Sequence, residues 1–425
     1  MPCHIPLAGY NGRQDYIKGD EVKLKSIPPR LLLATLMLLL VACGGGSEPL
    51  PDIEATVEAE VQKRIDAMPT QAQKLTDATP SVEKNDGVGT HYGLTSPWDT
   101  RAFKNKVELL PGQCPDPIGL LTQIPDRLED GAFNEAAWSN IGSDIVIPLS
   151  DQAISNGSQV AAICVLDYLY FWAKNNAFVV DSECKTDGAH WEHGYDRSNF
   201  TTGTLIIPYL QIRNASVLDE TKRSVVLSWF EQLQMCNKTR AKGMLLDAQE
   251  NGFGPHNQTY SALLAVAMTS IALGKTHEFN WAIESYRESI ATISPDGTAP
   301  NEVAHKMEWT QHYHTLIENF SIHLVLLGEI NGVNGLFEDF GLIRLTNMVL
   351  DSYFGSTYLE ELTGYEQTQN PLTTPWNLSW VEHLKRYNED PRLTQLATQF
   401  QWQMDHYHTG GHPEYWWPEH MKSNS

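Results

Sequence analysis

The stretch NQTYSALLAVAMTSIALG, residues 257–274, is followed after one residue by THEFNWAIESYRESIATI, residues 276–293. Both stretches repeat apolar residues at helical spacing, so they predict two helices joined by a very short loop. Helices connected this closely pack against each other as an antiparallel pair. The same periodicity recurs in six further stretches: 156–176, 219–236, 308–330, 337–353, 375–388 and 392–408.

Strand signals are scarce along the chain. The best candidate is DIVIPL, residues 144–149, although its proline cannot donate a hydrogen bond to a sheet. Glycine and proline separate the helical stretches, as in GFGP at 252–255 and SPDG at 294–297. No repeat is visible at the level of residue identity, which argues against TPR-like arrays. The sequence therefore predicts one all-α domain of the toroid or solenoid type.

The composition limits the possible partners. The chain has 425 residues, 41% of them hydrophobic, which is enough for a large core. Its net charge of −22 argues against nucleic acid, because phosphate binding needs a basic surface. A polyanionic polysaccharide would need a local basic and aromatic cleft on this acidic surface.

The N-terminal region has the pattern of an export signal. The apolar run from Leu31 to Ala42 is too short to span a bilayer and suits a signal peptide. It ends in LVAC, residues 40–43, which resembles a bacterial lipoprotein cleavage site with Cys43 as the lipidated residue. We expect a signal peptide over 1–43, a flexible stalk over 44–100, and a lipid-anchored protein in the periplasm, on the outer membrane or on the cell surface. An ordinary signal peptide with a chance cysteine is the alternative.

Four cysteines remain in the expected mature chain: Cys114, Cys164, Cys184 and Cys236. An exported chain can oxidise them, and four cysteines allow three pairings. Their spacings are not those of a zinc site.

Two polar clusters interrupt the apolar helices. The first, NEVAHKMEWTQHYH at 301–314, places Lys306 seven residues before Tyr313. On one continuous helix these two side chains would share a face about 10 Å apart. A cation near a tyrosine stabilises the phenolate, which can remove a carbon-bound proton. The second cluster, PHNQTY at 255–260, lies at an expected helix start.

Seven segments resemble, in order and spacing, the periplasmic poly(β-D-mannuronate) lyases, the AlgL-type alginate lyases. The resemblance covers roughly residues 110–400. The segments are CVLDYLYFWAK (164–174), YLQIR (209–213), VLSWFEQL (226–233), FNWAI (279–283), DGTAPNE (296–302), YH (313–314) and WVEHLKRYNEDPRL (380–393).

This resemblance implies a fold and an activity. The fold is an (α/α) toroid of antiparallel helix pairs around a central cleft, here within residues 101–425. The activity is β-elimination of mannuronate-rich alginate or a related 4-linked uronan, with no metal and no cofactor. The resemblance also implies a disulfide between Cys114 and Cys164, which closes a loop of about 50 residues.

The resemblance also assigns site residues by position. In the family an Arg lies seven residues before the tyrosine of a Tyr-His pair. Tyr313 and His314 match that pair, and Lys306 takes the Arg position once a one-residue insertion is allowed. Lysine keeps the charge but loses the bidentate grip on a carboxylate.

The family's Asn-Asn-His segment is changed in this chain. An alignment without gaps through Tyr260 places His256, Asn257 and Gln258 over Asn, Asn and His. A shift of one or two residues places Asn257 or His256 over the histidine instead. Both residue types are present, in a different order.

Elimination from a 4-linked uronate requires removal of the C5 proton after the adjacent carboxylate has been neutralised. His256, Asn257 and Lys306 are the expected neutralising donors. Tyr313 is the expected base and acid. Free tyrosine has a pKa of about 10, well above neutral pH. Positive charge on Lys306 and His314 would therefore have to stabilise the phenolate. The residues expected to contact substrate are His314, Gln258, Tyr260, Trp309 and His305.

Alternative readings remain at this stage. A lyase for another acidic glycan, such as glucuronan, and a non-catalytic glycan-binding lipoprotein both fit the same residues. DGAHWEHGYD at 187–196 is a weak metal-loop candidate, since it lacks helical ligand spacing. The aromatic tail HTGGHPEYWWPEH at 408–420 suits sugar stacking or packing on the domain. Glu302 and Glu308 suggest a paired-acid hydrolase, but six residues on a helix turn them to different faces.

Overall fold

The computed structural model describes residues 93–99, 103, 114, 146–174, 205–368, 375–400 and 409. The chain divides into two units, Met1–Asp86 and Gly87–Ser425, and every described residue belongs to the second. The expected signal peptide with Cys43, most of the stalk, the 187–196 loop and all of the aromatic tail except Thr409 lie outside the described residues. In the described part, no helix is both long and apolar enough to cross a membrane.

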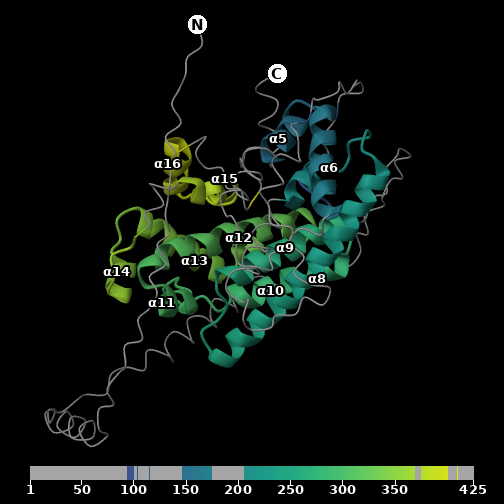
Figure 1. Ribbon diagram of the computed structural model, residues 1–425. Coiled ribbons are helices and arrows are strands. Elements are labelled where there is room, and N and C mark those ends of the chain that lie inside the picture. Colours follow the sequence, from purple (N-terminus) through teal and green to yellow (C-terminus); the bar gives the residue numbers. More distant parts are fainter. Residues whose placement is uncertain are drawn as a thin grey trace, which may run out of the picture. The chain divides into compact units, whose positions relative to one another are not determined.

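All regular elements in these ranges are helical (Figure 1). The α-helices are α5 (Ile147–Ser155), α6 (Gln159–Lys174), α8 (Glu220–Asn251), α9 (Asn257–Leu273), α10 (Thr276–Ile290), α11 (Pro300–Lys306), α12 (Thr310–Ile330), α13 (Phe340–Tyr353), α14 (Tyr358–Thr363), α15 (Ser379–Leu384) and α16 (Pro391–Phe400). Short 3-10 turns are η3 (Met307–Trp309), η4 (Leu336–Glu338) and η5 (Pro375–Leu378). Residues 205–212 are also helical.

Helix α9 lies at the centre of the packing. It contacts α8, α10 and α12, and Figure 1 shows it among these three helices. Its residues are buried on nearly every side, as expected for a helix that is apolar all round. Alanine, serine and threonine occupy many of its positions, so neighbouring helices can approach its backbone closely. This packing fixes the start of α9, where one of the two polar clusters lies.

The weak strand candidate at 144–149 is helical over its described residues, 146–149. Residues from Ile147 onward form α5, and Val146 already has a helical backbone conformation. Pro148 explains the difference, because a proline in the first helical turn loses no helix hydrogen bond and has its φ preset for a helix.

Helix α8 continues well beyond the predicted 219–236. Asp219 begins it by accepting hydrogen bonds from the backbone N–H groups of Thr221 and Lys222, at 2.8 and 3.0 Å. Gly252, with φ of 72°, ends it in the left-handed conformation that glycine adopts without strain. The second half buries Arg240, which becomes important at the site.

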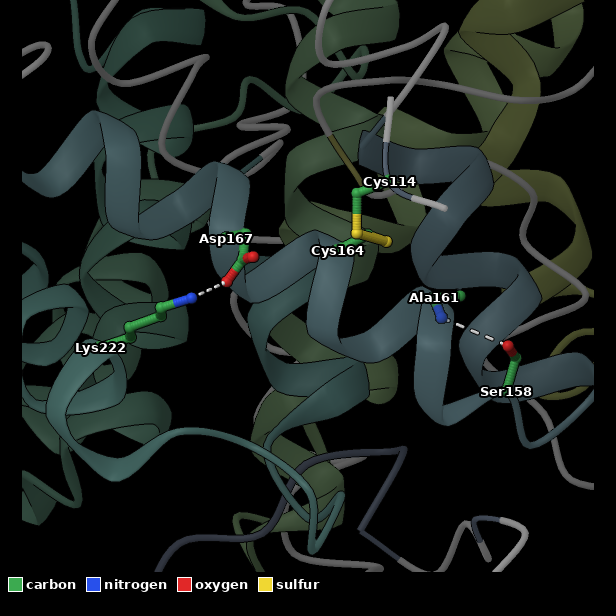
Figure 2. Close-up of a disulfide and its surroundings, with 6 residues drawn as sticks. All are labelled: Cys114, Ser158, Ala161, Cys164, Asp167 and Lys222. Atoms are coloured by element: carbon green, nitrogen blue, oxygen red, sulfur yellow. Dashed lines mark hydrogen bonds and ion pairs between the residues drawn. A yellow bond between two sulfur atoms is a disulfide. The ribbon is translucent and has the colours of Figure 1, made fainter. Parts of the chain in front are cut away.

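A disulfide and an ion pair hold α6 in place. Figure 2 shows the bond between Cys114 and Cys164, whose Cα atoms are 5.3 Å apart. This is the pairing that the family resemblance implies. On the same helix, Asp167 accepts a hydrogen bond from the Lys222 ammonium of α8 at 2.6 Å (Figure 2). Cys236 on α8 is also disulfide-bonded.

Candidate active site

The two polar clusters, 45 residues apart in sequence, meet directly. Glu302 on α11 accepts hydrogen bonds at one carboxyl oxygen, Oε1, from the Asn257 backbone N–H at 2.6 Å and from Asn257 Nδ2 at 2.8 Å. The exposed fraction is 0% for Glu302 and 2% for Asn257. The first backbone donor of α9, which no helical carbonyl can satisfy, is therefore bound by a buried carboxyl group from α11.

A second contact ties the same segments. Asn301 Nδ2 donates to the carbonyl oxygen of Gly254 at 3.0 Å. Gly254 has φ of 75°, and an added Cβ would lie 2.9 Å from the Thr292 hydroxyl oxygen, so glycine suits this turn. Adjacent residues of α11 thus hold both the loop before α9 and its first residue.

The sequence predicted Lys306 and Tyr313 on one continuous helix, but the structure places them on two helices, α11 and α12. Helix α11 ends at Lys306, and Met307 takes φ of 45°, a positive value that no other non-glycine residue in the described ranges has. Gln367 supports the break by donating to the Met307 carbonyl at 3.1 Å and accepting from the Gln311 backbone N–H at 2.9 Å.

The break brings the cation closer to the phenol. Lys306 Nζ lies 4.6 Å from the centre of the Tyr313 ring, instead of about 10 Å along a straight helix. Tyr313 is half-buried, and its ring meets the His312 ring edge-on with centres 5.1 Å apart. Trp309 lies next to His312, with ring centres 6.0 Å apart. The tyrosine therefore has a cation over its face and the His312 ring at its side.

His314 does not supply the positive charge expected of it. Its exposed fraction is 0%; Nε2 accepts from the Ala299 backbone N–H and Nδ1 donates to the Thr310 carbonyl oxygen, each at 2.7 Å. This bonding requires the neutral ring, and burial lowers the pKa of His314 to about 4. His314 is therefore neither the cation nor the substrate contact that the sequence had suggested. It is a neutral ring whose hydrogen bonds connect α12 to the start of α11.

The expectation that Tyr260 contacts the substrate is also wrong. It is fully buried in α9 and packs edge-on against Tyr286, with ring centres 6.3 Å apart. Burial raises the pKa of Tyr260 far above its usual value. The residue belongs to the core, because a side chain with no exposed surface cannot contact a polysaccharide.

The remaining cluster residues form a basic group at the start of α9. Arg240 of α8 donates to Gln258 Oε1 at 3.1 Å. Burial first, and then the charges of Lys306, Arg240 and His305, lower the pKa of His256 to about 4. His256 is therefore a neutral imidazole on which the positive charges of Arg240 from α8 and Lys306 from α11 act, and this positive electrostatic environment suits a carboxylate ligand.

Sequence reasoning missed Arg240 and the role of Glu302. Arg240 lies in a charged part of α8 where apolar periodicity is faint, and nothing in the sequence distinguishes it from an exposed arginine. In the sequence, Glu302 indicates only one acid of a possible hydrolase pair. Its burial and bonding to Asn257 leave it no free access to a glycosidic oxygen, and Glu308 lies beyond the break in η3.

His305 and Trp309 lie at the edges of the site. His305 is exposed, contacts the Asn301 carbonyl through Nδ1 at 2.9 Å, and packs edge-on against Phe253. Trp309 is half-buried in η3. In the described ranges no three His, Cys, Asp or Glu side chains are placed to hold a metal ion.

Comparison with known proteins identifies relatives of one kind. Residues 135–351 match the protein family described as Alginate lyase. Alginate lyases from Cobetia marina and from Pseudomonas fluorescens (strain SBW25) are each 21% identical to the chain over 236 residues, 54% of its length. The match covers 59% of the first protein and 60% of the second, so the chain spans about three fifths of these relatives.

Solved structures share the fold. Alginate lyase A1-III from Sphingomonas species A1 superimposes with a TM-score of 0.54 at 14% identity, over 77% of this chain and 90% of that chain. A variant of alginate lyase A1-III in complex with a tetrasaccharide gives a TM-score of 0.52 at 16% identity, over 87% of this chain and 90% of that chain. The likeness confirms the predicted all-α toroid fold.

Proposed function

Because the chain belongs to the alginate lyase family, we propose that it cleaves mannuronate-rich alginate, or a related 4-linked uronan, by metal-independent β-elimination. The observation that carries this proposal is the Lys306 ammonium 4.6 Å from the centre of the Tyr313 ring, next to the basic group at the start of α9. These are a proton-transfer group and a carboxylate-binding group on neighbouring elements.

The carboxylate of the sugar is neutralised first. Asn257 through its amide, His256 through its neutral imidazole, and Lys306 through its ammonium are the donors in this proposal. Arg240, which the structure adds to this group, contributes positive charge from α8. Binding the carboxylate with donors and cations lets negative charge flow into it as the C5 proton leaves.

Tyr313 then removes the C5 proton. The electron pair from the C–H bond forms the C4–C5 double bond, and the C4–O glycosidic bond breaks. The departing oxygen receives a proton, which Tyr313 supplies when proton and leaving group lie on one side of the ring. Lys306 stabilises the phenolate that this step needs. Gln258, His305 and Trp309 lie around these groups and are the proposed substrate contacts.

A panel of uronans tests this proposal. Purified protein is incubated with mannuronan, guluronan, glucuronan and mixed alginate, and ultraviolet absorbance of the unsaturated product is followed. We expect the fastest rise with mannuronan and an unchanged rate after treatment with a metal chelator. A preference for glucuronan assigns the same chemistry to another substrate, and no rise with any uronan contradicts the lyase proposal.

A non-catalytic glycan-binding protein is the second candidate. It is favoured by the altered Asn-Asn-His segment, in which Gln258 accepts a hydrogen bond from Arg240, and by lysine at the Arg position. Product-free binding of mannuronate oligosaccharides, measured by calorimetry, supports this candidate.

The export proposal rests on the sequence alone. We propose that Cys43 is lipidated and anchors the protein in the periplasm, on the outer membrane or on the cell surface. Expression in a bacterial host with labelled palmitate should label the wild-type chain and not Cys43→Ala. Equal labelling of both contradicts the proposal.

A further inference from the structure

Glu302 stands out among the buried groups because it faces the site and has no place in the proton transfer. It lies on α11 one turn before Lys306, and its exposed fraction is 0%. Burying a carboxyl group is costly unless its oxygens are hydrogen-bonded. Here one oxygen receives both the side-chain and the backbone N–H of Asn257.

These two hydrogen bonds fix how Asn257 is oriented. The amide of asparagine can turn over and exchange its oxygen and nitrogen. With Nδ2 bonded to Glu302 Oε1 at 2.8 Å, the turned-over amide would face that oxygen with its own oxygen, which is repulsive. The bond to the backbone N–H at 2.6 Å holds the first residue of α9 at the same time, and with it the flanking His256 and Gln258.

We propose that Glu302 is a positioning residue, whose carboxyl holds the Asn257 amide and the start of α9 in the orientation that binds the uronate carboxylate. This inference rests on the proposed function of the site. Glu302 itself does not touch the substrate, so it acts through Asn257.

The chemistry of the group makes a sharp choice of variant possible. Burial raises the pKa of Glu302, while the hydrogen bonds from Asn257 oppose the shift. The hydrogen-bond geometry needs an acceptor oxygen at the Oε1 position, because both Asn257 N–H groups donate to it. Glu302→Gln keeps that acceptor, and Glu302→Ala removes it.

The experiment compares these two variants with a matched control. Glu318 on α12 is a second carboxyl with an exposed fraction of 0%; outside the site, it accepts a hydrogen bond from the Thr346 hydroxyl of α13 at 2.7 Å. Glu318→Gln thus loses a buried carboxyl without touching Asn257. Turnover of mannuronan is measured for each variant. The Kd for a mannuronate oligosaccharide is measured in a Tyr313→Phe background, so that the ligand is not cleaved.

We expect Glu302→Ala to lose about 100-fold in kcat/KM and to weaken the Kd, because misplacing a binding group has effects of that size. Glu302→Gln should keep most of both, and Glu318→Gln should change only the thermal midpoint. Asn257→Ala combined with Glu302→Ala should lose no more than the worse single variant, since Glu302 acts through Asn257.

The contrary results are distinct. Losses that multiply in the double variant, or a folded Glu302→Ala with wild-type Kd and turnover, overturn the inference. If the wild type binds the oligosaccharide without turnover, the lyase proposal fails while the Kd cycle still decides the role of Glu302. A wild type that neither binds nor cleaves any uronan overturns both.

Discussion

At the scale of single residues, the account depends on what lies against Tyr313. Lys306 approaches the ring to 4.6 Å from its centre, whereas His314, its sequence neighbour, is turned inward and bonded through both ring nitrogens. Lys306 therefore lies beside Tyr313, closer than the sequence predicted, and its role there stays a proposal, whereas His314 is a neutral structural group.

The first prediction concerns Lys306. Lys306→Met removes the cation that favours the phenolate, so the rise of activity with pH should move to higher pH. The rate at neutral pH should fall by about 10²-fold, the usual scale for impaired general acid–base catalysis. Lys306→Arg keeps the charge and should keep the pH profile. The measurement is kcat/KM on mannuronan from about pH 5 up to about pH 10, the ordinary pKa of free tyrosine. An unshifted profile for Lys306→Met speaks against the role.

The second prediction uses the buried ring of His314. Its folded pKa is about 4, below the unfolded value of 6.5. Between these values the unfolded chain binds a proton that the folded chain does not, so stability is full above pH 6.5 and falls as pH falls toward 4. His314→Gln should be less stable than the wild type at pH 7. On going to pH 5, the variant should lose less stability than the wild type, by up to about 2 kcal/mol.

Urea unfolding at the two pH values checks this prediction. His277→Gln, at an exposed histidine of α10, is the control and should follow the wild type. A His314→Gln variant whose stability falls with pH as steeply as that of the wild type contradicts the assignment of His314 as a buried neutral ring.

Some candidate site residues can be recognised from the sequence and others cannot, for a physical reason. The sequence offers Tyr313, Asn257, His256 and Lys306 as candidates because they interrupt apolar helices at positions that match a family pattern. Arg240 could not be found this way, since its place in the site depends on how α8 packs against the start of α9. Burial of a polar residue is a property of tertiary contacts, which periodicity in one helix does not reveal.

At the scale of elements, long apolar helices were predicted within a few residues. Helices α9, α10 and α12 agree with the stretches 257–274, 276–293 and 308–330 because burial on most sides leaves a strong periodic signal. The second half of α8 is rich in charge, so its signal fades although the helix continues. The break between α11 and α12 was missed because it depends on Gln367, which arrives from a distant part of the chain.

The third prediction concerns that break. Met307 has φ of 45°, a conformation that costs a side-chain-bearing residue about 1 kcal/mol or more. Met307→Gly should therefore raise the free energy of unfolding by about 1 kcal/mol. Met235→Gly, at an exposed position inside α8, should lower it by about as much, because glycine weakens a helix interior. A loss of stability in Met307→Gly in denaturant unfolding contradicts the strained turn.

At the scale of the whole molecule, the acidic chain and its basic site are compatible. The net charge is −22, yet the charges of Lys306 and Arg240 both act to lower the pKa of His256. The toroid fold makes this possible by bringing α8, α9 and α11 together at one place. The family resemblance predicted that fold, whereas composition and periodicity alone left a solenoid open.

The fourth prediction belongs to the same scale. The disulfide between Cys114 and Cys164 spans 50 residues of sequence and restrains the unfolded chain. Replacing both cysteines by serine should lower the free energy of unfolding by about 2–4 kcal/mol. Turnover per folded molecule should stay unchanged, because the bond lies on α6 and not at the site. Denaturant unfolding and kcat together check this; a stable variant with altered kcat argues against a purely structural bond.

The central claim is that Tyr313 transfers the proton in a β-elimination, and one comparison tests it most directly. Tyr313→Phe removes a single oxygen, and the half-buried ring can keep its packing and its contact with Lys306. The measurement is the rate of unsaturated product formation from mannuronan by wild type and variant, at concentrations that saturate both as judged by oligosaccharide Kd. The account predicts a variant that binds with wild-type affinity and loses at least about 10³-fold in kcat. A Tyr313→Phe protein that binds and still cleaves at a rate near that of the wild type contradicts it.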